Sequence, residues 1–254
     1  MLARKIVRSA LVRTPRLYDR WTGQWRYRAY YRLGMVHERE FRALPFLVHT
    51  QNPLVLDIGG NNGQSILSIK QVLPEARVVT FEPASRHQAD LQALAAWLPD
   101  VTIRRQALGN TDREETLYWP VYNGMAMHAL ASLDRAEAES WLDPSRIYGF
   151  RQDQLELAQE GVEVRRLDGL GLDPDVLKID VQGTEADVIA GGIETIRRDR
   201  PVIMAEALHE GGPAHAVLEP HEYRLYSFSS GRFEPGADPG ATNHFLIPAE
   251  RLPA

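Results

Sequence analysis

The chain has 254 residues, of which 44% are hydrophobic and 25% charged, so it is long enough to fold as one large domain or two small ones. It has no cysteine, which excludes disulfides, thiolate zinc sites and a cysteine nucleophile. Residues 1–50 carry eleven basic and three acidic residues, a net charge of +8, and the overall charge of −5 leaves −13 for the remainder. An acidic body argues against a nucleic-acid substrate, because phosphate contacts dominate that kind of affinity.

The basic arm, residues 1–50, is expected to form a helical extension that packs on the acidic domain. Its aromatic side chains leave open a peripheral contact with anionic lipid, or with a bulky substrate. Arginines interrupt its apolar residues, and no apolar run in the chain approaches the roughly 20 residues that span a bilayer. We therefore expect a cytoplasmic protein.

After the arm, apolar runs alternate with helical patterns, as in a βαβ series. Strands are expected at 54–59, 76–83, 101–108, 175–181 and 200–208, and helices at 64–73, 85–97 and 185–197. The strands lack polar alternation, which is typical of parallel strands covered on both faces. We predict one doubly wound α/β domain over residues 51–254.

Two later segments complete this prediction. Residues 223–229 and 242–248 are expected to close the mostly parallel sheet as an antiparallel pair. Residues 109–166 are too long for a plain connection, so we expect a lid or substrate insertion there. It would cover the crevice at the carboxyl ends of the strands, where ligands bind in such sheets.

The turn after the first strand carries the first candidate ligand contacts. Its glycines would let a ligand approach the backbone, which also fits a dinucleotide site or a turn with no ligand. Asp57 disfavours a pyrophosphate, since two like charges about 4 Å apart cost about 4 kcal/mol at an effective dielectric near 20. S-adenosylmethionine has no phosphate and carries an ammonium and a sulfonium, so we predict it as the ligand. The expected contacts are Asp57, Gly59, Gly60, Asn61 and Gly63.

Glu82 ends the second strand, about 20 residues after the glycine turn. A carboxylate there can accept both hydroxyls of a ribose, in methyltransferases and NAD enzymes alike. Glu82 therefore predicts an adenosine ligand without choosing between them. Gln106 and Ala107 end the third strand, where the adenine edge would lie.

The fourth strand places Lys178 and Asp180 on the same side, because side chains alternate along a strand. A lysine in an apolar central strand needs a partner, and Asp180 and Glu206 are the nearest candidates. The cluster could simply fix the strand ends. We favour the interpretation that Asp180 faces the methyl donor, because the strand ends at the crevice.

The segments VLDIGGNNGQS, FEP, ALGN and LKIDVQGTEADVIAGG…RPVIMAE resemble the ordered motifs of the FkbM family of methyltransferases, over Leu54 to Glu206. The resemblance implies a class I methyltransferase (Rossmann-like) fold, S-adenosylmethionine as donor, and a hydroxyl acceptor on a sugar, glycolipid or polyketide. It also implies that Asp57, Gly59 and Gly63 line the donor site and that Glu82 holds the ribose. Gln182 stands where the family motif usually has Glu, which puts any charge-based role of that position in doubt.

The hypothesis for the chemistry is in-line transfer of the sulfonium methyl to the acceptor oxygen, with most of the catalysis in positioning. The hydroxyl proton needs a base, and the candidates are Asp180, then His128 of the lid, then His209. A structural role is the alternative for His128. Asp180, Glu185 and Glu206 could offer oxygen ligands to Mg²⁺, but Glu185 suits the start of a helix, so no metal site is predicted.

Two other functions stay open at this point, an NAD-dependent oxidoreductase and a non-catalytic module that binds S-adenosylmethionine. The sequence does not indicate an oligomeric state. A group of large side chains in the insertion fits a bulky, partly apolar acceptor, or simply the insertion's own core. These are Trp119, Tyr122, Met125, Met127, Trp141 and Tyr148.

Overall fold

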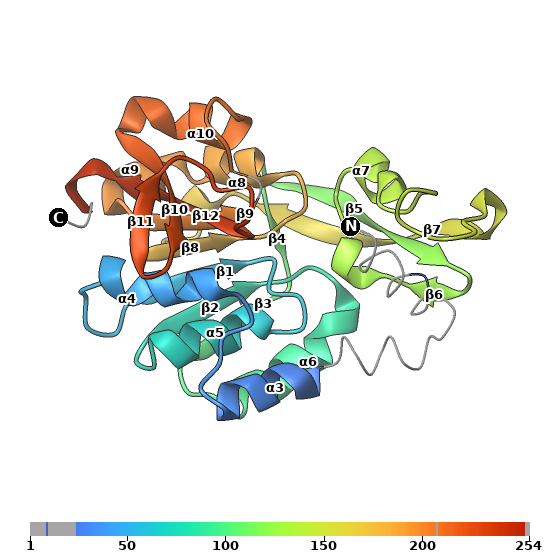
Figure 1. The fold of residues 1–254 in the computed structure, drawn as a ribbon, viewed down its shortest axis with the longest axis horizontal. Coiled ribbons are helices and arrows are strands. Elements are labelled where there is room, and N and C mark those ends of the chain that lie inside the picture. The colour runs from blue at the N-terminus through green and yellow to red at the C-terminus, as the bar shows by residue number, and fades with distance from the viewer. Residues whose placement is uncertain (1–8, 10–23, 207, 252–254) are drawn as a thin grey trace.

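The computed structural model describes residues 9, 24–206 and 208–251, and Figure 1 shows the main sheet between two layers of helices. Eight strands form this sheet, in the order β11-β10-β12-β9-β8-β1-β2-β3. The five parallel strands are β1 (Leu54–Ile58), β2 (Arg77–Phe81), β3 (Val101–Arg104), β8 (Val176–Ile179) and β9 (Val202–Glu206). The antiparallel strands are β10 (Tyr223–Ser229), β11 (Arg232–Pro235) and β12 (Asn243–Pro248). The predicted doubly wound, mostly parallel sheet with an antiparallel closing pair is confirmed.

Two apolar clusters lie on the two faces of the sheet, because neighbouring side chains of each strand point to opposite faces. Val55 of β1 belongs to one cluster, and Leu56 and Ile58 belong to the other. The α-helices that cover the sheet are α3 (Gln24–Arg32), α4 (Leu44–Leu47), α5 (Gln64–Val72), α6 (Ser85–Ala95), α8 (Glu185–Gly191), α9 (Ile193–Asp199) and α10 (Pro213–Leu218). The short 3-10 helices outside the insertion are η1 (Arg39–Ala43), η4 (Leu167–Gly169), η5 (Glu219–His221) and η6 (Ala249–Arg251).

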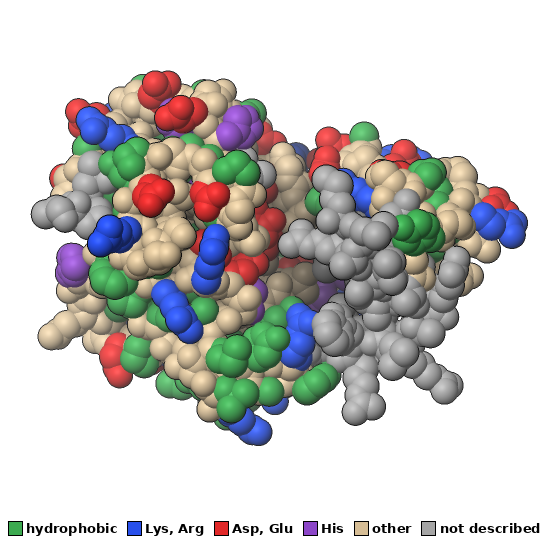
Figure 2. Space-filling view, viewed as in Figure 1, with side chains coloured by type: hydrophobic (Ala, Val, Ile, Leu, Met, Phe, Trp, Pro, Cys, Tyr) green, Lys and Arg blue, Asp and Glu red, His purple; other side chains and the backbone are tan. Residues whose placement is uncertain are grey.

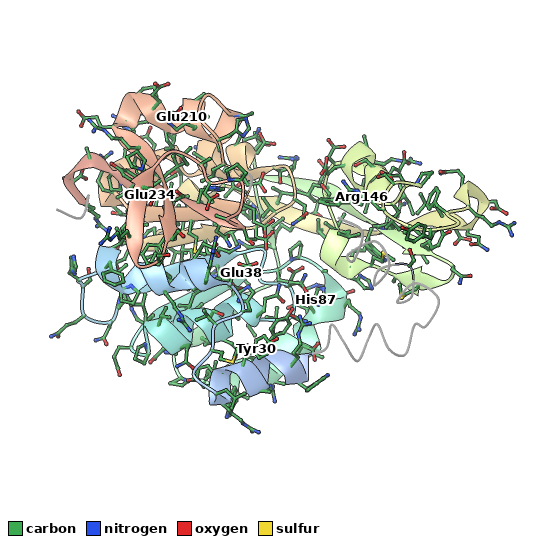
Figure 3. The ribbon with its side chains drawn as sticks, viewed as in Figure 1. Tyr30, Glu38, His87, Arg146, Glu210 and Glu234 are labelled. Atoms are coloured by element: carbon green, nitrogen blue, oxygen red, sulfur yellow. The ribbon has the colours of Figure 1, made fainter. Side chains whose placement is uncertain are left out.

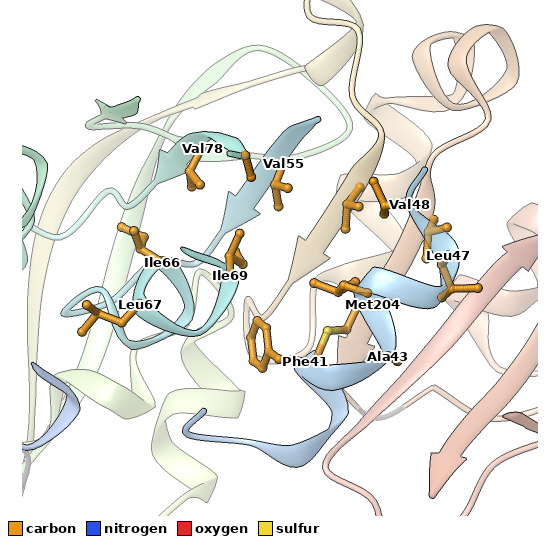
Figure 4. Packing of buried hydrophobic residues seen from close by; sticks show 14 of the residues in the cluster. Phe41, Ala43, Leu47, Val48, Val55, Ile66, Leu67, Ile69, Val78 and Met204 are labelled. Carbon is orange, nitrogen blue, oxygen red and sulfur yellow. The ribbon is translucent and has the colours of Figure 1, made fainter. Parts of the chain in front are cut away.

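The second half of the basic arm packs into the main core. Phe41 in η1 is fully buried, next to Met204 in Figure 4, and belongs to the same apolar cluster as Val55. The arm is helical at α3 as expected, whereas most of residues 1–23 lies outside the described residues. Trp25 and Leu33 are exposed there, and membrane contact through the arm stays a prediction.

The predicted insertion forms a second sheet in the order β4-β7-β5-β6, which projects from the main body in Figure 1. Its elements are β4 (Ala107–Leu108), β5 (Arg113–Tyr122), β6 (Met125–Ala126), η2 (His128–Leu130), α7 (Arg135–Ser140), η3 (Gln152–Gln154) and β7 (Leu155–Arg165). We call residues 107–165 the lobe. The strand expected at 101–108 is therefore wrong in one respect. The chain leaves the main sheet after Arg104, and Ala107 pairs with Val164 of the long β5–β7 hairpin.

The lobe has its own core, which contains Tyr122, Met125 and Met127. These three side chains pack with Leu142 and Ile147. Half of the large side chains considered for acceptor binding are thus structural. No helix within the described residues is long and apolar enough to cross a membrane.

Candidate functional site

A cavity of about 240 Å³ lies at the carboxyl ends of β1, β2, β8 and β9, beneath the lobe. The main sheet and the lobe both contribute walls, and acidic side chains are visible in the recess between them in Figure 2. Figure 3 shows Glu38 and His87 where the main body faces the lobe. The position is the ligand-binding crevice of an open α/β sheet.

The glycine turn forms the floor of this cavity through close backbone contacts. The N–H groups of Gly59 and Gly60 both donate to the Phe81 carbonyl, at 2.9 and 3.2 Å. A Cβ atom on Gly59 would overlap the Asp180 carbonyl oxygen, and the residue has a φ of +87°. A Cβ atom on Gly60 would overlap the Thr80 hydroxyl. Only glycine permits the turn to lie this close to β2 and β8.

Asp57 lies under the turn and not in the cavity wall, which differs from the expectation of a direct ligand contact. Its side chain is fully buried and accepts a hydrogen bond of 2.9 Å from the Thr80 hydroxyl. Hydrogen bonding from Ser65 and Thr80 favours its charged form. Burial raises the pKa of Asp57, against the opposing charge of Lys178.

Glu82 does line the cavity, at the end of β2 as predicted. One oxygen accepts from the Asn61 N–H at 2.7 Å, and the other accepts from the Ala84 N–H at 2.9 Å. Burial raises its pKa to about 7 even though both bonds favour the charged form. Two backbone donors thus fix the orientation of this carboxylate.

Lys178 is buried beneath a group of carboxylates, as the strand pattern indicates. Its Nζ lies 3.4 Å from Asp180 Oδ2. Burial lowers the pKa of Lys178, but the charges of Asp180, Glu38 and other carboxylates outweigh it, so the pKa is raised overall. Burial and then Asp180 raise the pKa of Glu206 to about 7. The charge of one lysine therefore stabilises several acidic groups, of which Asp180, Glu38 and Glu206 line the cavity.

Glu38 is a wall residue that the sequence analysis missed. Asn243 of β12 donates a 2.7 Å hydrogen bond to Glu38 Oε2, and His37 Nε2 lies 3.4 Å from the same oxygen. Burial raises the pKa of Glu38, but hydrogen bonding and charge from His37 bring it below its ordinary value. The residue lies in the arm, far in sequence from every recognisable motif, so no local pattern indicated it.

His128 enters the cavity from the lobe. Its ring lies 4.9 Å from the Trp119 ring, and it meets the His87 ring edge-on at 5.9 Å. Burial, followed by the charges of His128 and Arg86, lowers the pKa of His87 to about 4, so His87 is neutral near pH 7. The structure therefore brings two of the three base candidates, Asp180 and His128, into one cavity.

Four further predicted site residues lie outside the cavity wall, and two of them, Gly60 and Gly63, belong to the glycine turn. His209 lines a separate hollow of about 150 Å³, which shares only Glu206 with the main cavity. Ala107 lines the cavity, but Gln106 does not, and its Nε2 is buried without a hydrogen-bond partner among the described residues. Ser132 and Thr184 are further polar wall residues that the sequence did not single out.

The lining suits an adenosine compound that carries positive charge. Four acidic residues line the cavity, namely Glu38, Glu82, Asp180 and Glu206. No Lys or Arg is among the described residues that line it. A pyrophosphate would face these carboxylates without a cation, and a sulfonium and an ammonium would be attracted by them. Apolar side chains that could contact the adenine ring come from strands of both sheets and from the loop before α7. They are Ile58, Phe81, Leu108, Leu117 and Leu133.

The described residues contain no group of three His, Asp or Glu side chains arranged to hold a metal ion. Glu185 begins α8, where a negative charge is favourable.

Comparison with known proteins shows which protein family the chain matches. A model of the methyltransferase FkbM domain matches residues 57–228. The 2-O-methyltransferase NoeI of Sinorhizobium fredii is 30% identical over 196 residues, which cover 70% of this chain and 74% of that protein. The AMB antimetabolite synthetase AmbE of Pseudomonas aeruginosa is 34% identical over 177 residues, but these are only 8% of its length. The structure of methyltransferase FkbM from Methylobacillus flagellatus KT aligns with a TM-score of 0.50 and 15% identity, over 83% of this chain and 48% of that one.

Proposed function

Because the chain belongs to the FkbM family of methyltransferases, with a class I fold and S-adenosylmethionine as its cofactor, we propose that it methylates a hydroxyl group of an uncharged acceptor. The observation that carries this proposal is a cavity that combines four acidic wall residues with no basic one among the described residues. NoeI, whose name describes a 2-O-methyltransferase, supports oxygen as the acceptor atom.

When bound, S-adenosylmethionine supplies an activated methyl group on a sulfonium. Glu82 would accept the ribose hydroxyls, and the turn at Gly59 would let the donor lie against the backbone. Asp57 would add a favourable field from below the turn. These groups are held before the donor arrives, which reduces the cost of ordering it.

Asp180 is the first candidate for the group that removes the acceptor proton, and His128 is the second. Both line the cavity and come from opposite walls, so a hydroxyl between them could reach either. Asp180 is fixed by Lys178 and Gln182, and the His128 ring is fixed by Trp119 and His87. Fixed orientation is what a base needs in order to act as the new bond forms.

The acceptor side of the cavity points to a neutral, hydroxyl-bearing compound such as a sugar, glycolipid or polyketide. Thr184 offers an uncharged hydrogen-bonding group in the same wall as Asp180 and Glu206. A phosphate or carboxylate on the acceptor would meet acidic walls and lose affinity.

The test begins with calorimetry of the purified chain with S-adenosylmethionine, S-adenosylhomocysteine and NAD. We expect saturable binding of the first two and none of NAD. Saturation with NAD alone would support an oxidoreductase and contradict the proposal.

The second step is a methylation assay on a panel of glycosides, glycolipids and polyketides, each paired with a phosphorylated or carboxylated analogue. We expect methyl ethers of neutral members only. Donor binding without product across the panel would favour a non-catalytic binding module. On the active acceptor, Asp180→Asn should lower kcat about 100-fold or more with donor affinity retained. His128→Ala should lower it less, and the reverse order would move the base assignment to His128.

A further inference from the structure

Gln182 makes two contacts that join the catalytic end of β8 to the lobe. Its side-chain Nε2 donates a 2.9 Å hydrogen bond to Asp180 Oδ1. Its backbone carbonyl accepts a 3.1 Å hydrogen bond from the Ser132 hydroxyl. Gln182 thus lies between the proposed base and a residue of the other sheet.

The turn that carries Gln182 has an unusual backbone. Gln182 has a φ of +54° and Gly183 a φ of +97°, both in the left-handed region. A non-glycine residue in this region needs support from its surroundings. The Ser132 hydroxyl supplies such support from a side chain that is only 1% exposed and whose residue forms a β-bridge with Tyr118 of β5.

The amide also completes the surroundings of Asp180. Lys178 contacts Oδ2 and Gln182 contacts Oδ1, so each oxygen has a donor on its own side. A glutamate at position 182 would put a second carboxylate against Asp180, in a group that already contains Glu38 and Glu206. Like charges in contact disfavour ionisation of both groups. The neutral amide provides a donor without that repulsion.

We propose that Gln182 is a positioning residue, whose amide orients the Asp180 carboxylate toward the acceptor and whose backbone, held by Ser132, makes that orientation depend on the docked lobe. This inference rests on the proposed function.

The first test needs no acceptor. The side-chain amide signals of ¹⁵N-labelled protein are recorded with S-adenosylhomocysteine bound, and Gln182→Ala identifies those of Gln182. We expect their chemical shifts to differ between the wild type and Asp180→Asn, because the hydrogen bond to Asp180 Oδ1 is changed. Signals that are identical in the wild type and Asp180→Asn at every pH would overturn the inference, whatever the activity of the chain.

The second test uses the acceptor found in the methylation panel. Gln182→Ala should lower kcat about tenfold, the size of one hydrogen bond to a charged group, with donor KM unchanged. Gln182→Glu should shift the acid limb of the pH–rate profile upward by about one unit, since the two carboxylates share one site. Ser132→Ala should lower kcat in the same direction but by less.

Gln152→Ala is the matched control, because Gln152 is exposed on η3 of the same lobe, and it should leave rate and pH profile unchanged. Suppose that the wild type is active and that Gln182→Ala and Gln182→Glu have the same rate and pH profile as the wild type. This result would refute the positioning role and leave the proposed function intact. A wild type that methylates nothing would instead remove the function, and the amide signals would still decide whether the contact exists.

Discussion

Glu82 keeps its carboxylate against two backbone N–H groups while burial raises its pKa to about 7. The ribose hydroxyls would donate to its ionised form, so donor binding should favour the state that has lost the proton. Affinity for S-adenosylhomocysteine should therefore rise about tenfold per pH unit below 7 and level off above it. Calorimetry between pH 5.5 and 8.5 measures this directly.

Two variants decide whether Glu82 is the titrating group. Glu82→Gln should bind the ligand weakly and without pH dependence. Glu206→Gln removes the other cavity carboxylate whose pKa is raised to about 7, and it should keep the dependence. The opposite pattern would assign the titration to Glu206.

The sequence was sufficient to predict the location of residues that directly follow a strand. Glu82 and Asp180 line the cavity because each directly follows a parallel strand, and such strands end at one edge of the sheet. Glu38 and Ser132 could not be found this way, since each reaches the cavity through long-range packing of the arm or the lobe. The contact between Gln182 and Asp180 depends on a left-handed backbone that a motif does not reveal.

At the scale of elements, the main body and the lobe approach closely at Gly191, the last residue of α8. A Cβ atom there would overlap the Gly109 carbonyl, just after β4. Gly191→Ala should therefore destabilise the fold by about 3 kcal/mol through overpacking. The expected drop in Tm is about 6–12 °C for a chain of this size.

Gly161→Ala is the matched control for this prediction. Gly161 is an exposed residue of β7, and a Cβ atom added there would have open space around it within the described part of the chain. We expect its Tm to stay the same or rise slightly, because alanine costs less than glycine in a strand. Equal losses in the two variants would mean that the α8–β4 approach is not tight.

The expected elements were correct where apolar runs were continuous, and wrong where tertiary contacts redirected the chain. The segment 101–108 reads as one strand, yet its two halves pair with different sheets. The helix expected at 185–197 is two helices separated at Gly192, where a Cβ atom would lie 2.8 Å from Leu167 Cδ2. The first break has no local signal and depends on what packs against the segment. The second coincides with the pair Gly191–Gly192, a local helix-breaking signal that the expected single helix did not take into account.

At the scale of the whole molecule, the arm and the sheet form one folding unit from residue 39 onward. Phe41→Ala should lower the free energy of unfolding by about 3–5 kcal/mol, because Phe41 is fully buried in the main core. Phe46→Ala, on neighbouring α4 and 55% exposed, should change it little. Denaturant unfolding measures both. A small effect of Phe41→Ala would instead indicate that the arm, residues 1–50, folds separately from the domain that begins at residue 51.

The walls of the cavity come from residues as distant as Glu38 and Glu206, with the lobe between them in sequence. No continuous fragment that lacks either end of this span contains the complete site. A protein molecule that has lost either end of this span, or that has assembled only its central strands, lacks part of the cavity wall. Occupancy by the donor therefore marks intact copies, and mass action then protects those copies from heat and proteases ahead of damaged ones.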